Sequence, residues 1–219
     1  MLRFAITDRS AGSPDNPASD NPESERQRRL IASCAALAIQ GIDFLLIREK
    51  DLADAPLAAL SRAIIAAIHE TGSSIKVLIS RRLDIALAVR AHGVHLSAAP
   101  GELTPDYVRR LIPNAFVSVS CHSLDDVRRA RDNGASAILF GPIFGKVVAG
   151  VEAVPGVGLD LLRHACTLAG NTPVFALGGI TTDNAAACTS VGASGIAAIR
   201  MFFAEPIQTK VPDIIESNI

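Results

Sequence analysis

Residues 115–140 read AFVSVSCHSLDDVRRARDNGASAILF and predict one complete strand–helix–strand unit. The apolar runs Ala115–Val119 and Ala137–Phe140 have the length and composition of buried strands. Between them, Ser123–Asn133 has the pattern of a helix, because an acidic residue three places after its first residue gives the spacing of a capping box and Gly134 is a stop signal. Such a unit is typical of a parallel sheet with crossover helices.

The same alternation extends over most of the chain. The predicted strands are the eight apolar runs Arg3–Thr7, Asp43–Ile47, Ile75–Ile79, Gly93–Leu96, Ala115–Val119, Ala137–Phe140, Pro173–Leu177 and Gly195–Ile199. The predicted helices are the seven segments Ser24–Gln40, Leu52–Thr71, Leu83–His92, Thr104–Ile112, Ser123–Asn133, Leu159–Ala169 and Thr182–Val191. This pattern favours an α/β fold, a single-domain (β/α)8 TIM barrel, since open doubly wound sheets usually stop at about five to seven strands. No Gly-x-Gly-x-x-Gly motif follows the first run, which disfavours a dinucleotide-binding fold.

Composition limits the classes of protein that the chain can represent. With 219 residues, 49% of them hydrophobic, we expect one globular domain, 1–219, with a sizeable core. A formal net charge of -1 provides no global positive field, so neither nucleic acid nor a membrane is expected as a partner. The four cysteines form no C-x-x-C pair, which disfavours a zinc site and a disulfide framework. Because no signal peptide or membrane span is recognisable, we expect a cytoplasmic location.

Two long loops are expected. The segment 10–23 contains three prolines among Asp, Asn and Ser residues, and predicts a mobile loop over the first helix. The segment 141–158 follows the sixth strand, and we expect it to be an active-site loop.

Basic residues follow several of the predicted strands, where the active sites of such barrels lie. They are Arg9, Arg48, Lys50, Arg81, Arg82, Lys146 and Arg200. Arg48 offers a planar fork and Lys50 a compact charge, so together they predict a clamp for an oxyanion. The alternative interpretation of Arg48-Glu49-Lys50 is a surface ion pair within one loop.

A second anion site is predicted after the last two strands. Gly178 and Gly179 are expected to open a helix, whose N-terminal amides would approach a phosphate closely. Ile199 and Arg200 end the eighth strand and would complete the phosphate site that is usual at this place in the fold. Alternatively, Arg200 is a solvated residue at a helix start.

Of the five histidines, His122 is the candidate for catalysis, because it follows a strand and imidazole exchanges protons near neutral pH. Its alternative role is that of a helix-capping residue. His95 lies inside the fourth strand, where a hydrogen-bonded barrel residue is the favoured interpretation; the surface histidines are predicted to be His69, His92 and His164. Cys121 should point away from His122 by strand alternation, so a Cys–His nucleophilic pair is not expected. Besides Asp8 and Glu49 few carboxylates follow the strands, which gives little support for a metal site.

Four motifs together resemble the thiamine phosphate synthase superfamily. They are Arg48-Glu49-Lys50, Ser120-Cys121-His122-Ser123, Phe140-Gly141-Pro142-Ile143-Phe144 and Ala176-Leu177-Gly178-Gly179-Ile180-Thr181. The resemblance covers nearly the whole chain, from Ala5 to about Phe203. It implies one of two activities: synthases join hydroxymethylpyrimidine diphosphate to thiazole phosphate with magnesium, whereas thiazole tautomerases of the same fold aromatise a carboxythiazole phosphate.

The chain departs from the synthase pattern at the positions that bind pyrimidine, magnesium and diphosphate. Leu46 stands in place of a glutamine, Ile79–Arg82 in place of Val-Asn-Asp-Asp, Pro100 in place of a second metal-binding aspartate, and Lys146–Ala149 in place of Thr-x-Thr-Lys. A diphosphate leaving group needs its developing charge neutralised by a metal ion or an equivalent cation. Arg81 at a metal-ligand position would repel magnesium, although it could partly replace it.

The resemblance is closer to the tautomerase branch, which has patterns similar to Ile42–Glu49 and Arg82–Leu87 and a proton-transferring histidine at the position of His122. It implies His122 as the catalytic residue and no cofactor, magnesium being needed only by a synthase. The substrate-binding residues are then expected to be Arg48, Lys50, Ser80, Arg82, Ser120, Gly178, Gly179, Ile199 and Arg200.

The leading hypothesis is therefore a thiazole phosphate tautomerase of thiamine biosynthesis whose partner is a small phosphorylated thiazole. The alternatives are a divergent thiamine phosphate synthase and a noncatalytic barrel that binds a thiazole or thiamine phosphate and regulates another protein. A homodimer is compatible with exposed apolar helices.

Overall fold

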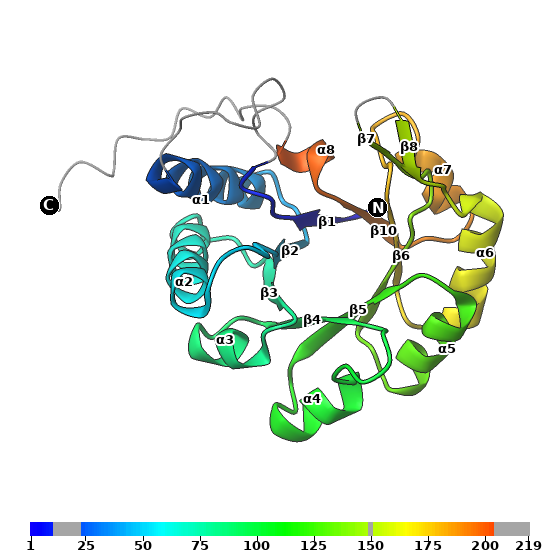
Figure 1. Cartoon of the computed structure of the whole chain (residues 1–219), viewed down its shortest axis with the longest axis horizontal. Coiled ribbons are helices and arrows are strands. Elements are labelled where there is room, and N and C mark those ends of the chain that lie inside the picture. The colour runs from blue at the N-terminus through cyan, green and yellow to red at the C-terminus, as the bar shows by residue number, and fades with distance from the viewer. Residues whose placement is uncertain (11–22, 149–150, 204–219) are drawn as a thin grey trace, which may run out of the picture.

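The computed structural model describes residues 1–10, 23–148 and 151–203, which form a closed barrel of parallel strands surrounded by helices (Figure 1). The barrel strands are β1 (Leu2–Ile6), β2 (Phe44–Ile47), β3 (Lys76–Ser80), β4 (Gly93–Ser97), β5 (Phe116–Cys121), β6 (Ala137–Phe140), β9 (Val174–Leu177) and β10 (Gly195–Ala198). They close in the order β1-β10-β9-β6-β5-β4-β3-β2, and each neighbouring pair is parallel. The predicted (β/α)8 TIM barrel is confirmed.

The helices pack around the outside of this barrel (Figure 1). They are α1 (Glu23–Ile39), α2 (Asp54–Glu70), α3 (Leu83–Ala88), α4 (Pro105–Leu111), α5 (Leu124–Asp132), α6 (Gly158–Ala169), α7 (Ala185–Ser190) and α8 (Arg200–Phe203). None of the described helices is long and apolar enough to cross a membrane. Part of the predicted mobile loop, 11–22, and the end of the predicted domain, 204–219, lie outside the described residues.

Two helices are each four residues shorter than predicted. The helix expected over Leu83–His92 ends at Ala88, and Arg90 has a φ of 55°, in the left-handed region that an α-helix of L-residues does not use. The helix expected from Thr182 begins only at Ala185, because the side chain of Asn184 accepts a hydrogen bond from the backbone N–H of Thr181 and forms a turn first.

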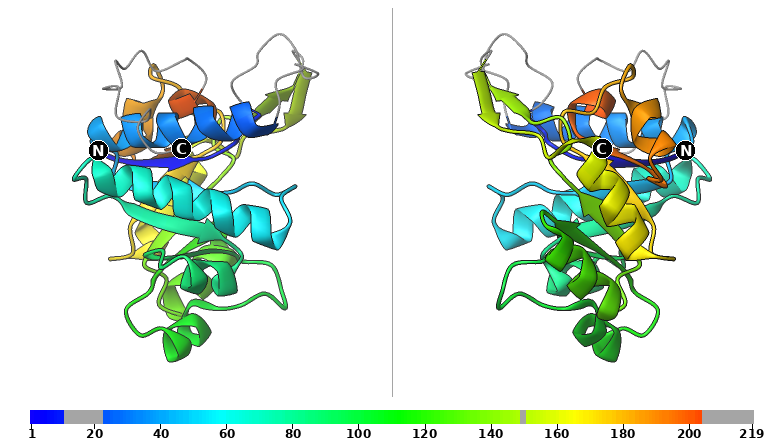
Figure 2. Two further views of the ribbon diagram at one scale, coloured as in Figure 1. Left: turned by 90° about the vertical axis from the view of Figure 1, so that its left-hand side faces the viewer. Right: turned by 90° about the vertical axis from the view of Figure 1, so that its right-hand side faces the viewer.

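The segment 141–158 contains a hairpin that the sequence reasoning missed. β7 (Lys146–Val148) and β8 (Val151–Val154) pair in an antiparallel way. Figure 2 shows this hairpin projecting from one end of the barrel. Valine-rich runs on either side of Ala149-Gly150 were the available signal.

The interior of the barrel is divided into an apolar and a polar end. Near the amino ends of the strands, the ring of Phe44 lies 5.1 Å from that of Phe4, 5.0 Å from that of Phe116 and 5.5 Å from that of Phe175, measured between centroids. Leu46, Leu78 and Leu139 are among the residues that continue this cluster. Since side chains fill the amino end, the barrel interior is open to a small molecule at the carboxyl ends of the strands, which we call the mouth.

Candidate functional site

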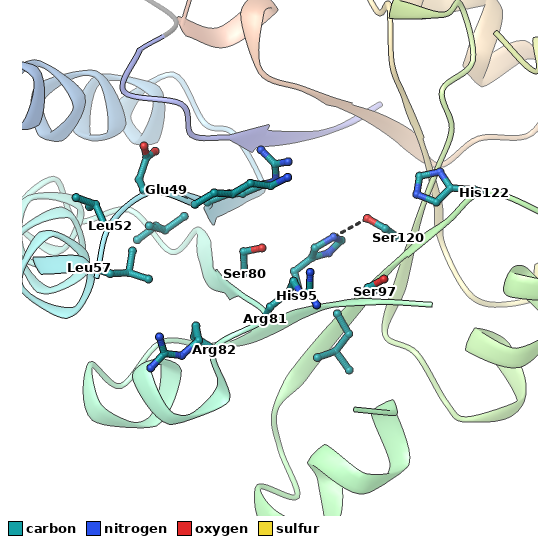
Figure 3. Close-up of a pocket in the computed structure, with 14 residues that line it drawn as sticks. Glu49, Leu52, Leu57, Ser80, Arg81, Arg82, His95, Ser97, Ser120 and His122 are labelled. Carbon is teal, nitrogen blue, oxygen red and sulfur yellow. Dashed lines mark hydrogen bonds between the residues drawn. The ribbon is translucent and has the colours of Figure 1, made fainter. Parts of the chain in front are cut away.

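The mouth contains a hollow of about 480 Å³ over the carboxyl ends of β2 to β5 (Figure 3). Its lining consists of Ile47, Arg48, Glu49, Lys50, Leu52, Leu57, Ser80, Arg81, Arg82, His95, Leu96, Ser97, Ser120 and His122. Six residues predicted from the sequence thus come together: Arg48, Lys50, Ser80, Arg82, Ser120 and His122. The sequence reasoning missed the apolar wall formed by Leu52 and Leu57, which follows the Arg-Glu-Lys motif, and it gave His95 no place in the site.

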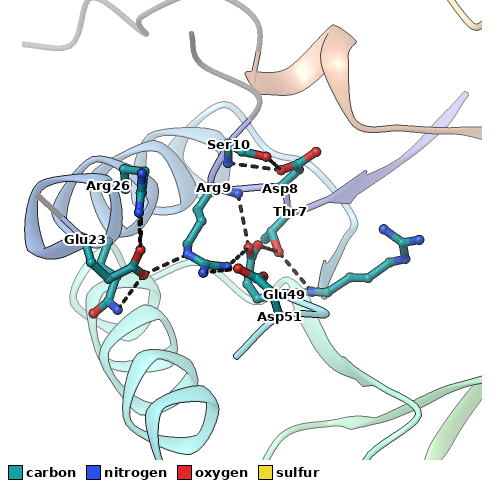
Figure 4. A network of polar contacts seen from close by, with 10 residues as sticks. Thr7, Asp8, Arg9, Ser10, Glu23, Arg26, Glu49 and Asp51 are labelled. Atoms are coloured by element: carbon teal, nitrogen blue, oxygen red, sulfur yellow. Dashed lines mark hydrogen bonds and ion pairs between the residues drawn. The ribbon is translucent and has the colours of Figure 1, made fainter. Parts of the chain in front are cut away.

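A buried polar network positions the backbone of Arg48 (Figure 4). Its backbone N–H donates to Thr7 Oγ1 at 2.9 Å, and Thr7 in turn donates to Glu49 Oε1 at 2.5 Å. The other carboxylate oxygen of Glu49 accepts from the backbone and the side chain of Arg9, at 3.2 and 3.1 Å. Glu49 is only 5% exposed and pairs with Arg9, which contradicts the alternative interpretation of a surface ion pair within the loop.

Arg9 belongs to this network and not to the lining of the hollow. Its side chain is 8% exposed and makes a bidentate contact with Asp51, at 2.6 and 2.5 Å, as well as a 2.8 Å contact with Glu23. The hydrogen bond to Asp51 raises the pKa of Arg9, and the same bond lowers the pKa of Asp51. Arg9 therefore ties β1, α1 and the loop after β2 together.

The basic residues that line the hollow differ in how their charges are compensated. Arg82 forms ion pairs with Asp54 and Asp84, and Arg81 pairs with Glu102. Within residues 1–10, 23–145 and 154–203, whose side chains the structure describes, the guanidinium of Arg48 forms no ion pair with a carboxylate. Arg48 is thus the arginine of the hollow that is best placed to receive an external anion.

His122 lies at the edge of the hollow, immediately after β5 (Figure 3). Its Nδ1 lies 2.5 Å from the carbonyl oxygen of Gly141. A carbonyl can only accept a hydrogen bond, so Nδ1 carries a proton and Nε2 of the neutral ring holds a lone pair. That arrangement is suited to a general base.

The capping box of α5 is confirmed, and the imidazole of His122 takes no part in it. Ser123 Oγ accepts from the backbone of Asp126 at 3.1 Å, and the carboxylate of Asp126 accepts from the backbone of Ser123 at 3.0 Å and from that of His122 at 2.9 Å. The helix cap consists of side chains other than the His122 ring, which contradicts the alternative role for this histidine.

Cys121 points away from the hollow, as strand alternation predicts. It is buried in the core between the barrel and the helices, and burial raises the pKa of its thiol to about 12. A protonated thiol that faces the opposite side of the strand cannot form a nucleophilic pair with His122.

His95 lines the hollow, and its ring contacts the hydroxyl group of Ser120 (Figure 3). Its Nδ1 is 2.8 Å from Ser118 Oγ, and its Nε2 is 2.7 Å from Ser120 Oγ. Burial, and then the positive charge of Arg48, lower its pKa to about 3, so the ring is neutral at physiological pH. The favoured interpretation of a hydrogen-bonded barrel residue is confirmed, but the ring also lines the hollow. The three predicted surface histidines, His69, His92 and His164, are exposed.

The four residues predicted after the last two barrel strands lie outside the lining of the hollow: Gly178, Gly179, Ile199 and Arg200. The glycine pair does not open a helix, because α7 starts only at Ala185. Both glycines have positive φ, 95° and 66°, and a Cβ atom would lie 2.6 Å from Pro142 or 2.8 Å from Phe144. Tight packing against the loop after β6 therefore explains their small size. Arg200 is exposed and begins the four-residue α8.

The carboxylates near the mouth are poorly suited to magnesium, which prefers several oxygen ligands. Glu49 is held by Thr7 and Arg9, and Asp8 Oδ1 accepts two hydrogen bonds from Ser10. Within the part of the chain that the structure describes, no group of three or more His, Cys, Asp or Glu side chains could hold a metal ion. These residues do not fit a magnesium diphosphate site.

Comparisons with known proteins agree with this architecture. The sequence model of a family described as thiamine monophosphate synthase matches residues 19–202. The chain belongs to this family. It is 36% identical over 167 residues to a thiamine-phosphate synthase of Methanoregula boonei, covering 76% of this chain and 74% of that protein. It is 29% identical over 204 residues to a thiamine-phosphate synthase of Roseiflexus sp., covering 93% and 78%.

A solved structure is also similar, that of a thiamine phosphate pyrophosphorylase from Pyrococcus furiosus. The TM-score is 0.74 at 25% sequence identity, over 94% of this chain and 89% of that one. Membership of the family places the chain among the enzymes of thiamine biosynthesis, and the predicted superfamily is confirmed.

Proposed function

We propose that the chain is a metal-independent thiazole phosphate tautomerase, which aromatises a carboxythiazole phosphate by proton transfer through His122. One observation carries the proposal: the Gly141 carbonyl holds the proton of His122 on Nδ1 and leaves Nε2 as a base at the edge of the hollow. The phosphorylated thiazole would be the small-molecule partner, and the cytoplasm the expected compartment.

In the proposed reaction, Nε2 of His122 takes a proton from a carbon atom of the thiazole system. The resulting imidazolium keeps its hydrogen bond to the Gly141 carbonyl and then delivers a proton to a second position of the substrate. One residue can serve as base and then as acid because the two transfers are sequential. No net charge is gained or lost by the substrate.

The substrate has two anionic groups, and two regions of the mouth are proposed to bind them. The Arg48 guanidinium, with Lys50 beside it in the lining, would receive the carboxylate. The phosphate would lie toward Gly178, Gly179, Ile199 and Arg200, where the exposed side chain of Arg200 would supply a positive charge. Holding both ends fixes the reacting carbon relative to His122.

The second candidate is a divergent thiamine phosphate synthase, because the named relatives are synthases. The donor set at the mouth favours the tautomerase. A diphosphate leaving group needs a metal ion or an equivalent cation, and here Glu49 is already engaged by Arg9, while Arg81 and Arg82 are paired with carboxylates.

The test is a pair of assays on the purified chain. One follows the conversion of the non-aromatic carboxythiazole phosphate into its aromatic tautomer. The other supplies hydroxymethylpyrimidine diphosphate and thiazole phosphate, with and without magnesium. We expect aromatisation and no thiamine phosphate. Steady formation of thiamine phosphate would establish the synthase instead, and binding of the thiazole without either reaction would indicate a regulatory barrel.

A further inference from the structure

The buried chain of hydrogen bonds Ser118–His95–Ser120 connects the barrel interior to the hollow. Residue His95 pairs with Ser118 in the register of β4 and β5, and Ser97 pairs with Ser120. Ser118 is fully buried and His95 is 6% exposed, whereas Ser120 lines the hollow. A polar group inside a barrel is costly unless its hydrogen bonds are satisfied, so the direction of each bond in this chain can be worked out.

The buried hydroxyl of Ser118 determines that direction. Among the described residues its one hydrogen-bond partner is His95 Nδ1, at 2.8 Å. A buried O–H proton needs an acceptor, so Ser118 donates to Nδ1, and Nδ1 carries the lone pair. The opposite tautomer, with a proton on Nδ1, would leave the Ser118 proton without an acceptor.

The direction of the hydrogen bond between His95 and Ser120 then follows. The neutral ring has its proton on Nε2, which donates to Ser120 Oγ at 2.7 Å. Because the Ser120 oxygen is accepting from His95, its own O–H proton is available to point into the hollow. Arg48, whose guanidinium lines the same hollow, places a positive charge close enough to disfavour protonation of His95.

We propose that His95 and Ser118 are positioning residues, which fix Ser120 as a hydrogen-bond donor to the carboxylate of the substrate next to Arg48. The identity of the carboxylate rests on the proposed function, but the direction of the hydrogen bonds does not. The two histidines of the hollow then have opposite tautomers. His122 offers a lone pair on Nε2, and His95 carries a proton on Nε2.

The first experiment needs neither ligand nor activity. Long-range proton–nitrogen NMR correlation on the full chain with 15N-labelled histidine distinguishes the two neutral tautomers, and comparison with His95→Gln assigns the signal. We expect the Nε2–H tautomer for His95. Ser118→Ala should raise the population of the Nδ1–H tautomer, because the variant lacks the hydroxyl proton that this tautomer would leave without an acceptor. An Nδ1–H tautomer in the wild type, or no change in Ser118→Ala, would overturn the assignment.

The second experiment measures binding of two probes by calorimetry, the aromatic carboxythiazole phosphate and the same thiazole phosphate without its carboxylate. Ser120→Ala and His95→Leu should each lower the affinity for the carboxylated probe roughly tenfold, as expected for the loss of one hydrogen bond to a charged group. The affinity for the probe without the carboxylate should change less than about twofold. His95→Gln keeps an amide donor close to the position of Nε2 and should bind nearly as the wild type does. Ser74→Ala, at the opposite end of the barrel, is the control.

Equal losses for both probes, or no loss in His95→Leu when circular dichroism shows the native fold, would refute the positioning role. If the wild-type chain binds neither probe, the proposed function and the carboxylate assignment both fail. The NMR result still decides the direction of the hydrogen bonds in that case.

Discussion

The two halves of the mouth are built in different ways. Over β2 to β5 the surface consists largely of polar side chains, such as Arg48, Ser120 and His122. Over β6 and β9 it consists largely of closely packed backbone, where a Cβ on Gly141 would lie 2.0 Å from the Leu177 carbonyl oxygen. In the first half a substitution changes the chemistry, whereas in the second half it changes the packing.

This difference separates the expected effects of mutations. Substitutions of side chains in the first half should alter the reaction rate or the substrate affinity and leave the fold intact. Added side chains in the second half should reduce stability before they alter any chemistry.

The largest effect is expected at His122. His122→Gln should lower the aromatisation rate roughly 10²- to 10⁴-fold, the usual contribution of a general acid–base group. His164→Gln, an exposed histidine on α6, is the matched control and should keep the wild-type rate. Comparable rates in both variants would remove His122 from the mechanism.

The next largest effect is expected at Arg48, and Arg82 in the same hollow serves as the comparison. Arg48→Met should raise KM about 10- to 100-fold, because a charged hydrogen-bonded contact contributes roughly 1.5–3 kcal/mol. Arg82→Met should raise it less than about threefold, since Arg82 is already paired with Asp54 and Asp84. Steady-state kinetics measure both values, and equal losses would show that existing ion pairs do not decide which arginine binds substrate.

A glycine pair tests the packed half. Gly179→Ala places a Cβ 2.8 Å from that of Phe144, whereas a Cβ on Gly72, which has a similar φ of 70° against 66°, would have no atom within 4 Å. Both variants carry the left-handed strain, so the clash should cost Gly179→Ala roughly 2 kcal/mol more in the free energy of unfolding. Urea denaturation gives both values. Equal destabilisation would mean that the loop after β6 adapts freely.

The effect that is smallest at neutral pH concerns the protonation of His95. Its pKa falls from 6.5 to about 3 in the folded chain. Above about pH 6.5 both states are neutral and the group adds no pH dependence, but between pH 6.5 and 3 only the unfolded chain binds the proton, so stability falls as pH falls. The expected slope is about 1.4 kcal/mol per pH unit.

Urea denaturation across this pH range gives the free energy of unfolding of the wild type and of His95→Gln. The difference between the two should change with pH by that slope, because the contributions of the other titrating groups cancel. Parallel pH profiles for the two chains would show that His95 takes up its proton equally easily in the folded state.

The sequence predicts the barrel and the position of His122 because both depend on local pattern. Strand and helix periodicity repeats along the chain, and residues directly after a strand must lie at the mouth. The limits of strands were predicted within two residues for the same reason. The hairpin β7–β8 was missed because its strands are too short for a clear period, although its valine content was visible.

Contacts between distant segments could not be predicted in the same way. Arg9 was expected among the basic residues at the mouth, but residues 40 and 42 positions later in the chain neutralise it. The role of His95 depends on the register that places it beside Ser118, and a single sequence does not specify that register. The glycine pair was attributed to a helix start because its neighbours across the mouth were unknown.

Metal independence is tested by the aromatisation rate of the wild-type chain, measured in single turnovers in the presence of EDTA. A base made by His122 and cations supplied by arginine and lysine need no divalent ion, so we predict the same rate with and without the chelator. A reaction that proceeds only after magnesium is added back would contradict proton transfer by His122 without a metal ion.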